Sequence, residues 1–179
     1  MYPDGGIARF RLYGTVYPNI SLSATNAGVL LDTASAIQGG VCVSFSDQHF
    51  GSADNLLLPG RGHDMSDGWE TKRSRSKGHI DWAIVKLGHK TLVKKVTVDT
   101  AHYRGNFPQF IVIEGLSTTE ESPKFDDPNW EVVVDKTKTG PDKEHDYEVK
   151  LGKAFTHVKL TMIPDGGVKR LRVLGTPVA

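Results

Sequence analysis

The sequence has few of the features that mark secreted, membrane-spanning or nucleic-acid-binding proteins. Its single cysteine, Cys42, excludes an intramolecular disulfide framework and a cysteine-based zinc site. No apolar run approaches the roughly 20 residues of a membrane span, and the N-terminus lacks the apolar core of a secretory signal. The 22 Lys and Arg residues nearly balance the 21 Asp and Glu residues, so there is neither a basic arm nor an acidic tail. We therefore expect a protein of a reducing, intracellular compartment.

The composition is that of a globular chain with many short elements. Hydrophobic residues make up 38% and charged residues 24% of the 179 positions, which is too apolar for a disordered chain. The 19 Gly and 9 Pro residues predict frequent turns. The length suits one ordinary domain and is short for two.

Residues 1–14 and 162–175 repeat one motif. The first reads MYPDGGIARFRLYG and the second MIPDGGVKRLRVLG, with a constant offset of 161 residues, as from Asp4 to Asp165. A repeat at this distance indicates whole homologous domains. In the second copy the motif ends a domain. We therefore expect 1–14 to be the terminal strand of a first repeat whose body is missing, 15–28 to be a linker and 29–179 to be the second repeat.

Alternation of apolar and polar residues predicts an all-β fold. A short helix is expected over 32–38, ended by two glycines. Strands are expected at 41–45, 80–87, 93–100, 110–114, 130–134, 147–151, 157–163 and 168–174. No helical pattern lies between them, which argues against parallel βαβ units. The fold class predicted is an antiparallel jelly-roll β-sandwich.

The last predicted strand has two arginines on one face. Alternation places Leu171 and Val173 on one side, and Arg170 and Arg172 on the other. The first copy of the motif has the same pattern. We expect a solvated arginine face that discourages edge pairing.

The stretch 47–79 is the main candidate for a functional loop. It has over thirty residues without a clear period, and such loops in compact domains are usually functional or disordered. Its Trp, His and Leu content argues against disorder. Loops of a sandwich gather at its ends, so we expect a ligand site there.

Two carboxylate–imidazole pairs are candidates for acid–base chemistry. Asp47 and His49 follow one strand, and Asp99 and His102 follow another. A carboxylate beside an imidazole can orient a general base or hold a divalent metal ion, although the spacing gives only a weak metal signal. The alternative for the first pair is that Asp47 caps a turn and His49 is half-buried.

A second group of residues suits the binding of a small anion. Trp69 offers an apolar plate, Glu70 an acid, and Arg73 and Arg75 two guanidinium forks that bind planar carboxylates. The alternative is an internal salt-bridge network that fixes the loop. From the residues alone, the prediction is a sandwich with an arginine-bearing loop site for a small anionic ligand.

Several motifs are similar to those of the allantoicase family. They are FSDQHFGSADNLLL at 45–58, GHDMSDGWETKRSR at 62–75, GHIDW at 78–82, VDTAH at 98–102, GNFPQ at 105–109 and PDGG at 164–167. The resemblance covers essentially the whole chain. It implies two tandem jelly-roll repeats like galactose-binding domains, in agreement with the repeated motif.

The resemblance also implies a reaction, the hydrolysis of allantoate to ureidoglycolate and urea in purine breakdown. Arg73 or Arg75 would hold the substrate carboxylate, and Asn55 and Glu70 the ureido groups. Trp69 and Asn106 would complete the binding site, and the two carboxylate–imidazole pairs would supply acid and base, with Glu70 as a further catalytic candidate. We expect no obligatory cofactor, while a divalent metal ion stays open.

The resemblance further implies a homo-oligomer in contact with the first repeat, located in the cytoplasm or peroxisome. Its partner would be the small anion allantoate, with no nucleic acid and no membrane. The alternative function is a non-catalytic binding or scaffold module that is inactive without the first repeat. A lectin-like sugar binder is a third interpretation, but few aromatic residues could serve as exposed platforms.

Overall fold

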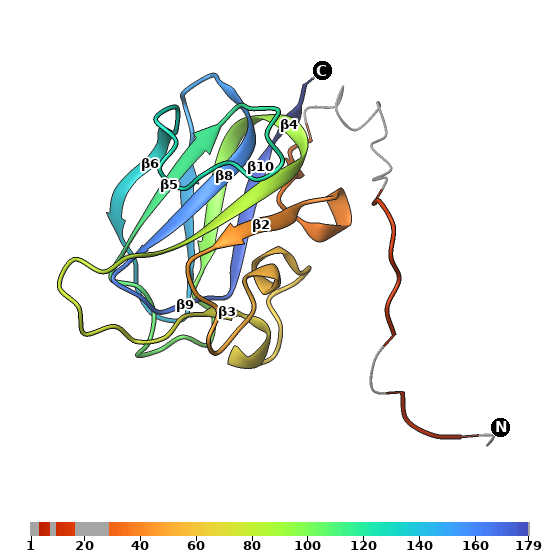
Figure 1. Cartoon of the computed structure of the whole chain (residues 1–179), viewed down its shortest axis with the longest axis vertical. Helices are drawn as coiled ribbons and strands as arrows, with labels where there is room; N and C mark the ends of the chain where they lie inside the picture. The colour runs from red at the N-terminus through yellow and green to blue at the C-terminus, as the bar shows by residue number, and fades with distance from the viewer. Residues whose placement is uncertain (1–3, 8–9, 17–28, 179) are drawn as a thin grey trace.

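The alternation of apolar and polar residues produces ten strands and three short 3-10 helices in the computed structural model, which describes residues 4–7, 10–16 and 29–178 (Figure 1). The strands are β1 (Leu31–Asp32), β2 (Val41–Phe45), β3 (Trp69–Glu70), β4 (Asp81–Asp99), β5 (Phe110–Leu116), β6 (Glu131–Lys138), β7 (Glu144–Glu148), β8 (Ala154–Ile163), β9 (Gly167–Val168) and β10 (Arg170–Pro177). The 3-10 helices are η1 (Ala36–Gln38), η2 (Ala53–Leu57) and η3 (Met65–Asp67). All assigned strand pairs are antiparallel, which confirms the predicted fold class.

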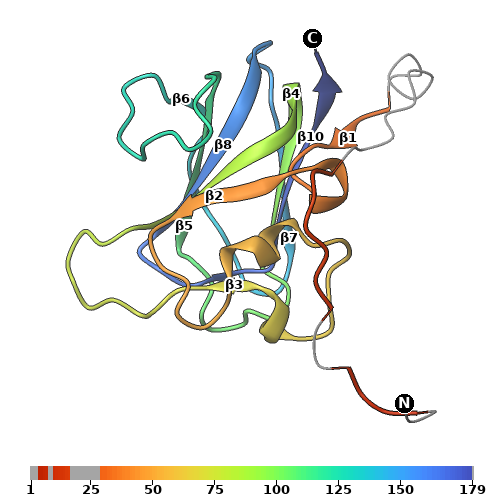
Figure 2. The same ribbon diagram turned by 45° about the vertical axis from the view of Figure 1, so that its right-hand side comes forward.

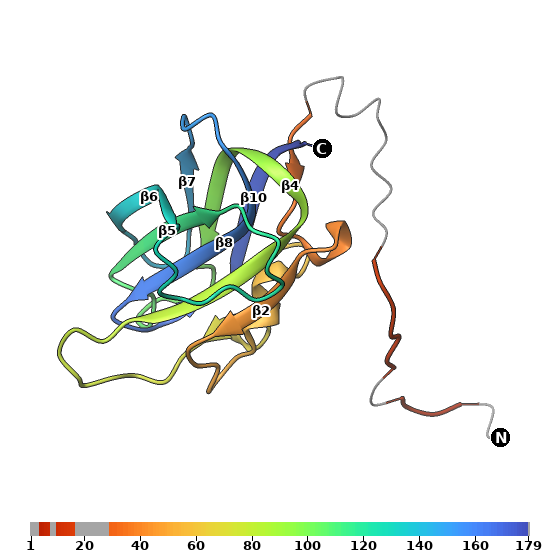
Figure 3. The same cartoon turned by 45° about the horizontal axis from the view of Figure 1, so that its top comes forward.

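The long strand β4 belongs to both layers of the sandwich. Its first half pairs with β2 and β8, and its second half pairs with β10 and β7. β5 and β6 extend the first layer beyond β8, while β1 lies at the outer edge of β10. Figures 1 and 3 show β4 curving from one layer into the other. Two separate strands were predicted here, and a bulge between Lys86 and Thr91 lets a single strand continue instead.

The core lies between these layers and is closed at one end by Trp69. Val85 and Leu160 from the first layer are fully buried, as are Val96 and Val173 from the second. Trp69 is also fully buried. It belongs to β3, which pairs with β9 at one end of the sandwich. The long loop 46–80 and the loop 100–109 lie at this end of the sandwich (Figure 1).

The predicted helix over 32–38 is wrong except for one turn. Asp32 pairs with Leu174 at the sheet edge, so the chain is still extended there. Helical geometry is confined to η1, which ends where Gly39 adopts a φ of 86°. The loop 47–79 is also more ordered than expected, because η2, η3 and β3 fall within it.

The prediction of a solvated arginine face on the last strand is also wrong, because Arg170 is buried. Arg170 is 1% exposed, and its guanidinium donates to the carbonyl oxygens of Asn55 and Asp67 and to the Asp67 carboxylate. The neighbouring Lys169 is fully buried and also pairs with Asp67. The loop that contains η2 and η3 folds over these cations, so the last strand is covered rather than solvated.

The described N-terminal residues lie outside the sandwich (Figures 1 and 2). No strand is assigned at 4–7 or 10–16, and the apolar side chains there are exposed. The expected linker lies mostly outside the described residues, and the domain boundaries stay predictions. Among the helices that the structure describes, none is both long and apolar enough to cross a membrane.

Candidate active site

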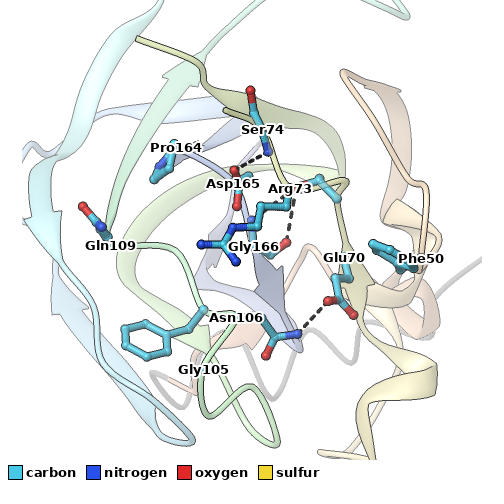
Figure 4. A pocket seen from close by; sticks show the side chains of 12 residues that line it. Phe50, Glu70, Arg73, Ser74, Gly105, Asn106, Gln109, Pro164, Asp165 and Gly166 are labelled. Carbon is cyan, nitrogen blue, oxygen red and sulfur yellow. Dashed lines mark hydrogen bonds between the residues drawn. The ribbon is translucent and has the colours of Figure 1, made fainter. Parts of the chain in front are cut away.

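A cleft of about 400 Å³ opens at the loop-rich end of the sandwich (Figure 4). Most of its lining comes from three segments that are far apart in the sequence: residues 70–74 at the end of β3, the loop 100–109 and the turn 163–167. Phe50 adds an aromatic ring from the segment after β2. The polar side chains that line the cleft are Glu70, Thr71, Arg73, Ser74, Asn106, Gln109 and Asp165. The two-stranded pairing of β3 with β9 brings the first and third segments together.

Hydrogen bonds to the loop 100–109 hold one side of the cleft. The Asn106 side-chain amide donates to Glu70 Oε1 at 2.6 Å, as Figure 4 shows. The Asn106 carbonyl oxygen accepts a hydrogen bond from the Gly167 backbone amide at 2.7 Å. Asn106 therefore fixes the Glu70 carboxylate at the edge of the cleft.

The PDGG turn at 164–167 anchors the segment that carries Arg73. The Thr71 backbone amide donates to the Gly166 carbonyl oxygen at 3.0 Å, and the Gly166 amide donates back to the Thr71 hydroxyl at 3.2 Å. Asp165 Oδ2 accepts from the Ser74 backbone amide at 2.8 Å. The repeated motif thus positions residues 71–74 along one wall.

The Arg73 guanidinium is the one cationic group of this cleft. Its side chain reaches into the middle of the cleft in Figure 4. Within residues 4–7, 10–16 and 29–178, no carboxylate forms an ion pair with it. A guanidinium in this state can bind a ligand carboxylate with two parallel N–H donors.

The two glycines of the turn are required by close packing. Gly166 has a φ of 139°, and a Cβ added there would lie 2.7 Å from the Asn106 carbonyl oxygen. A Cβ at Gly167 would overlap the ring of Tyr103. Tyr103 is fully buried, and burial raises the pKa of its hydroxyl, which donates to the Met65 carbonyl oxygen. The buried, un-ionised Tyr103 ring therefore packs beneath the turn that carries Gly167.

Three of the ten predicted site residues line this cleft together: Glu70, Arg73 and Asn106. The sequence interpretation missed Gln109, Asp165 and Gly166. The signal for the last two is the repeated PDGG motif, which by itself indicates a domain repeat and not a site.

The Asp47 carboxylate caps a turn and does not contact the His49 ring. Asp47 Oδ2 accepts from the backbone amides of His49 at 3.0 Å and Lys72 at 2.8 Å. The exposed His49 ring packs edge-on against Phe50, with 4.5 Å between centroids. The expected carboxylate–imidazole contact is therefore absent from this pair in the described structure.

Asp99 and His102 also point to different partners. Asp99 is buried, and its carboxylate accepts from Arg61 Nε at 2.8 Å and Arg61 Nη2 at 2.9 Å. The His102 backbone amide donates to Asp142. Asp99 lines a separate hollow of about 370 Å³ that contains Arg61. Any catalytic role of this pair stays a prediction without a contact between its members.

The remaining three candidates lie outside the cleft. The Asn55 side-chain amide donates to the Gly68 carbonyl oxygen at 3.0 Å, which ties down the loop. The Trp69 indole donates to the Asp47 carbonyl oxygen at 2.9 Å from within the core. Arg75 lines a neighbouring hollow instead.

The described residues do not provide a ligand set for a metal ion. No group of three or more His, Cys, Asp or Glu side chains in them is arranged to hold one. The divalent ion that the sequence left open therefore stays a prediction without assigned ligands.

Comparison with known proteins identifies relatives of this chain. A family model described as an allantoicase repeat matches residues 31–178. The chain is 59% identical over 177 residues to an allantoicase of Saccharomyces cerevisiae, and 54% identical over 175 residues to one of Neurospora crassa. These alignments cover 98% and 97% of this chain but 51% and 49% of the relatives. The chain thus spans about half the length of the curated relatives it matches.

Solved structures agree with this relationship. The crystal structure of an allantoicase from S. cerevisiae matches with a TM-score of 0.81 at 58% identity, over 98% of this chain and 49% of that chain. A family 32 carbohydrate-binding module of C. perfringens, solved with galactose, matches with a TM-score of 0.58 at 14% identity, over 82% of this chain and 98% of that chain. The second likeness concerns the fold alone, a galactose-binding-like jelly roll.

Proposed function

This chain belongs to the allantoicase family, and from that premise we propose that it supplies an active site for the hydrolysis of allantoate to ureidoglycolate and urea. The observation that carries the proposal is the Arg73 guanidinium, which lies in the cleft beside the Glu70–Asn106 pair. Allantoate has one carboxylate and two ureido arms on a single carbon. An unpaired guanidinium flanked by amides and carboxylates matches those groups.

Each part of the cleft has a task in this proposal. Arg73 binds the substrate carboxylate through two N–H donors. The side-chain amides of Asn106 and Gln109 face the ureido arms, and hydrogen bonds to the retained arm select which arm leaves. The Glu70 carboxylate, which Asn106 holds in place, accepts a proton from the attacking water.

The experiment that tests the proposal compares two arginines of one loop. Arg73→Ala removes the guanidinium of the cleft, whereas Arg75→Ala removes one that lies outside it. We expect purified protein to release urea from allantoate, and Arg73→Ala to lower kcat/KM by about 100-fold or more, since a charged hydrogen-bonded pair contributes about 3 kcal/mol. Arg75→Ala should stay within about threefold of the parent. Equal losses in both variants would contradict the assignment.

A second candidate function is a binding module that acts only with the other repeat. It is favoured by one observation, that the chain spans about half of its relatives. Urea release by this chain alone would exclude it. Binding of allantoate without urea release, followed by release when the N-terminal half of a full-length relative is added, would establish it.

We also propose a homo-oligomer located in the cytoplasm or peroxisome. Light scattering of the purified chain tests the first point. Fractionation of cells that express a tagged chain tests the second.

A further inference from the structure

A second hollow, of about 520 Å³, adjoins the cleft. The two share Arg73 and Ser74, which form a common wall. The far side of the second hollow is lined by His79 and Asp81, where the loop returns to β4. The proposed function uses none of the side chains on that side.

A buried carboxylate orients the His79 ring. Asp81 is 2% exposed, and its Oδ2 lies 3.1 Å from His79 Nε2. Its other oxygen accepts from the Ser46 hydroxyl at 2.7 Å, and Ser46 Oγ in turn accepts from the Trp82 backbone amide at 2.9 Å. Because an ionised carboxylate only accepts hydrogen bonds, Nε2 must carry a proton. Nδ1 is then the nitrogen left to exchange protons with a ligand.

The other six imidazoles lack this arrangement. In the described structure, His79 alone among the histidines lies within ion-pair distance of a carboxylate. Both ring nitrogens of His145 contact backbone groups, of Gly140 and Val98, and the His49 ring packs on Phe50. The described structure thus forms a carboxylate–imidazole pair between Asp81 and His79, which the sequence interpretation did not identify.

We propose that His79, oriented by Asp81, is the catalytic residue that donates a proton to the departing urea nitrogen. The inference rests on the proposed function and completes it, since Glu70 on the opposite side of Arg73 supplies only the base. A substrate whose carboxylate is held by Arg73 would extend one ureido arm into each hollow. The second hollow is then the place of the arm that leaves.

In the proposed step, water replaces one ureido group on the central carbon, and protons and electron pairs balance. Glu70 takes a proton from water, and the water oxygen bonds to the central carbon. The bond from that carbon to one ureido nitrogen breaks, and its electron pair goes to the nitrogen. The imidazolium of His79 gives its Nδ1 proton to this nitrogen, and neutral urea leaves. The proton on Glu70 then returns to His79 through solvent, which restores both groups.

Charged groups of several segments face the second hollow. Lys72, Arg73 and Arg75 contribute cations from the loop, while Asp81 contributes an anion from β4. Asp47 contributes a second carboxylate from the segment after β2. Arg73 is the cation that this hollow shares with the cleft, so a substrate carboxylate bound to it would lie at the wall between the two.

The test compares His79→Gln with His49→Gln. We expect the first variant to lower kcat by about 10²–10⁴-fold, with KM for allantoate changed less than about threefold. His49→Gln should behave like the parent. Asp81→Asn should lower kcat with KM kept, as expected of a positioning residue.

An activity-independent measurement accompanies the kinetics. Titration with allantoate should shift the ring signals of His79 in the NMR spectrum of the parent and not in Arg73→Ala. Full kcat in His79→Gln, or His79 signals that ignore bound allantoate, would overturn the inference while leaving the proposed function intact. Allantoate that binds to the parent and is never cleaved would overturn both.

Discussion

At the scale of single residues, the cations Lys169 and Arg170 fix the position of the loop that leads to the candidate site. Both are buried, and both reach Asp67 at the end of η3. A buried cation is stable only when it is paired and hydrogen-bonded, so the loop cannot lift from β10 without leaving two charges unpaired. Glu70 follows Asp67 after Gly68 and Trp69 in the chain. The position of Glu70 at the cleft is therefore tied to the last strand.

Gly166 gives a prediction at this scale. We expect Gly166→Ala to destabilise the fold by about 2 kcal/mol, because the side chain would have to occupy a positive φ and would press on the backbone at Asn106 and Pro108. Displacement of that loop should also lower urea release at least tenfold. Thermal unfolding and the urea assay measure the two effects.

The matched control is Gly105→Ala, in the same cleft. A Cβ at Gly105 meets no atom within 4 Å, and no positive φ is recorded there. Its stability should stay within about 0.5 kcal/mol of the parent. A similar loss in both variants would show that the cleft tolerates no added methyl group anywhere, and not that Gly166 is special.

At the scale of elements, β7 is fastened to β4 by a histidine. His145 Nδ1 lies 3.0 Å from the Val98 carbonyl oxygen, and Nε2 accepts from the Gly140 backbone amide at 2.8 Å. The ring must be neutral to make both contacts, because a protonated Nε2 would face an N–H donor. Burial lowers the pKa of His145 from its ordinary value of 6.5.

This arrangement predicts a loss of stability in mild acid. The unfolded chain binds a proton at His145 more readily than the folded one, so folding stability rises with pH in this range. The contribution of the neutral ring is complete above pH about 6.5 and is lost as the pH falls towards the lowered pKa of the folded state. The free energy of unfolding of the parent and of His145→Gln should therefore converge as the pH is lowered from 7.5 to 5. A constant difference across that range would contradict the prediction.

The strands could be predicted from the sequence more easily than the connections between them. Period-two alternation at 41–45 and 110–114 is a local signal, and both strands are present in the structure. The continuity of β4 depends on partners on both sides, which no local pattern encodes. The burial of Arg170 was also hidden, because arginine on a strand face is usually solvated and its cover comes from a loop about a hundred residues earlier.

The candidate site was predicted by type and only partly by position. Residue chemistry identified Arg73 and Glu70, because a guanidinium in a long loop can bind an anion and a carboxylate there can act as an acid or base. The two predicted carboxylate–imidazole pairs each join residues that follow one strand end, and the members of each pair have other partners in the described structure. The His79–Asp81 contact depends on the entry into β4, where the carboxylate is buried and the ring is not. Burial of that kind follows from the tertiary fold.

At the scale of the whole molecule, the two copies of the repeated motif are in opposite states. Leu171 and Val173 of the second copy are fully buried in β10. Their counterparts at the 161-residue offset, Phe10 and Leu12, are 81% and 84% exposed. An apolar pattern that is buried in one copy should seek a sheet in the other, since exposed apolar side chains cost free energy. The prediction that 1–14 is the terminal strand of a first repeat would account for this exposure.

This contrast gives a prediction about matched substitutions. Leu171→Ala should lower the free energy of unfolding by about 2–5 kcal/mol, as expected for a cavity in a core. Phe10→Ala should leave this chain within about 0.5 kcal/mol of the parent, because its side chain is 81% exposed. When the N-terminal half of a full-length relative is supplied, the same Phe10→Ala change should weaken association of the two, measured by calorimetry. If Phe10→Ala instead destabilises this chain alone, the N-terminal segment packs on its own sandwich and the case for a separate partner sheet fails.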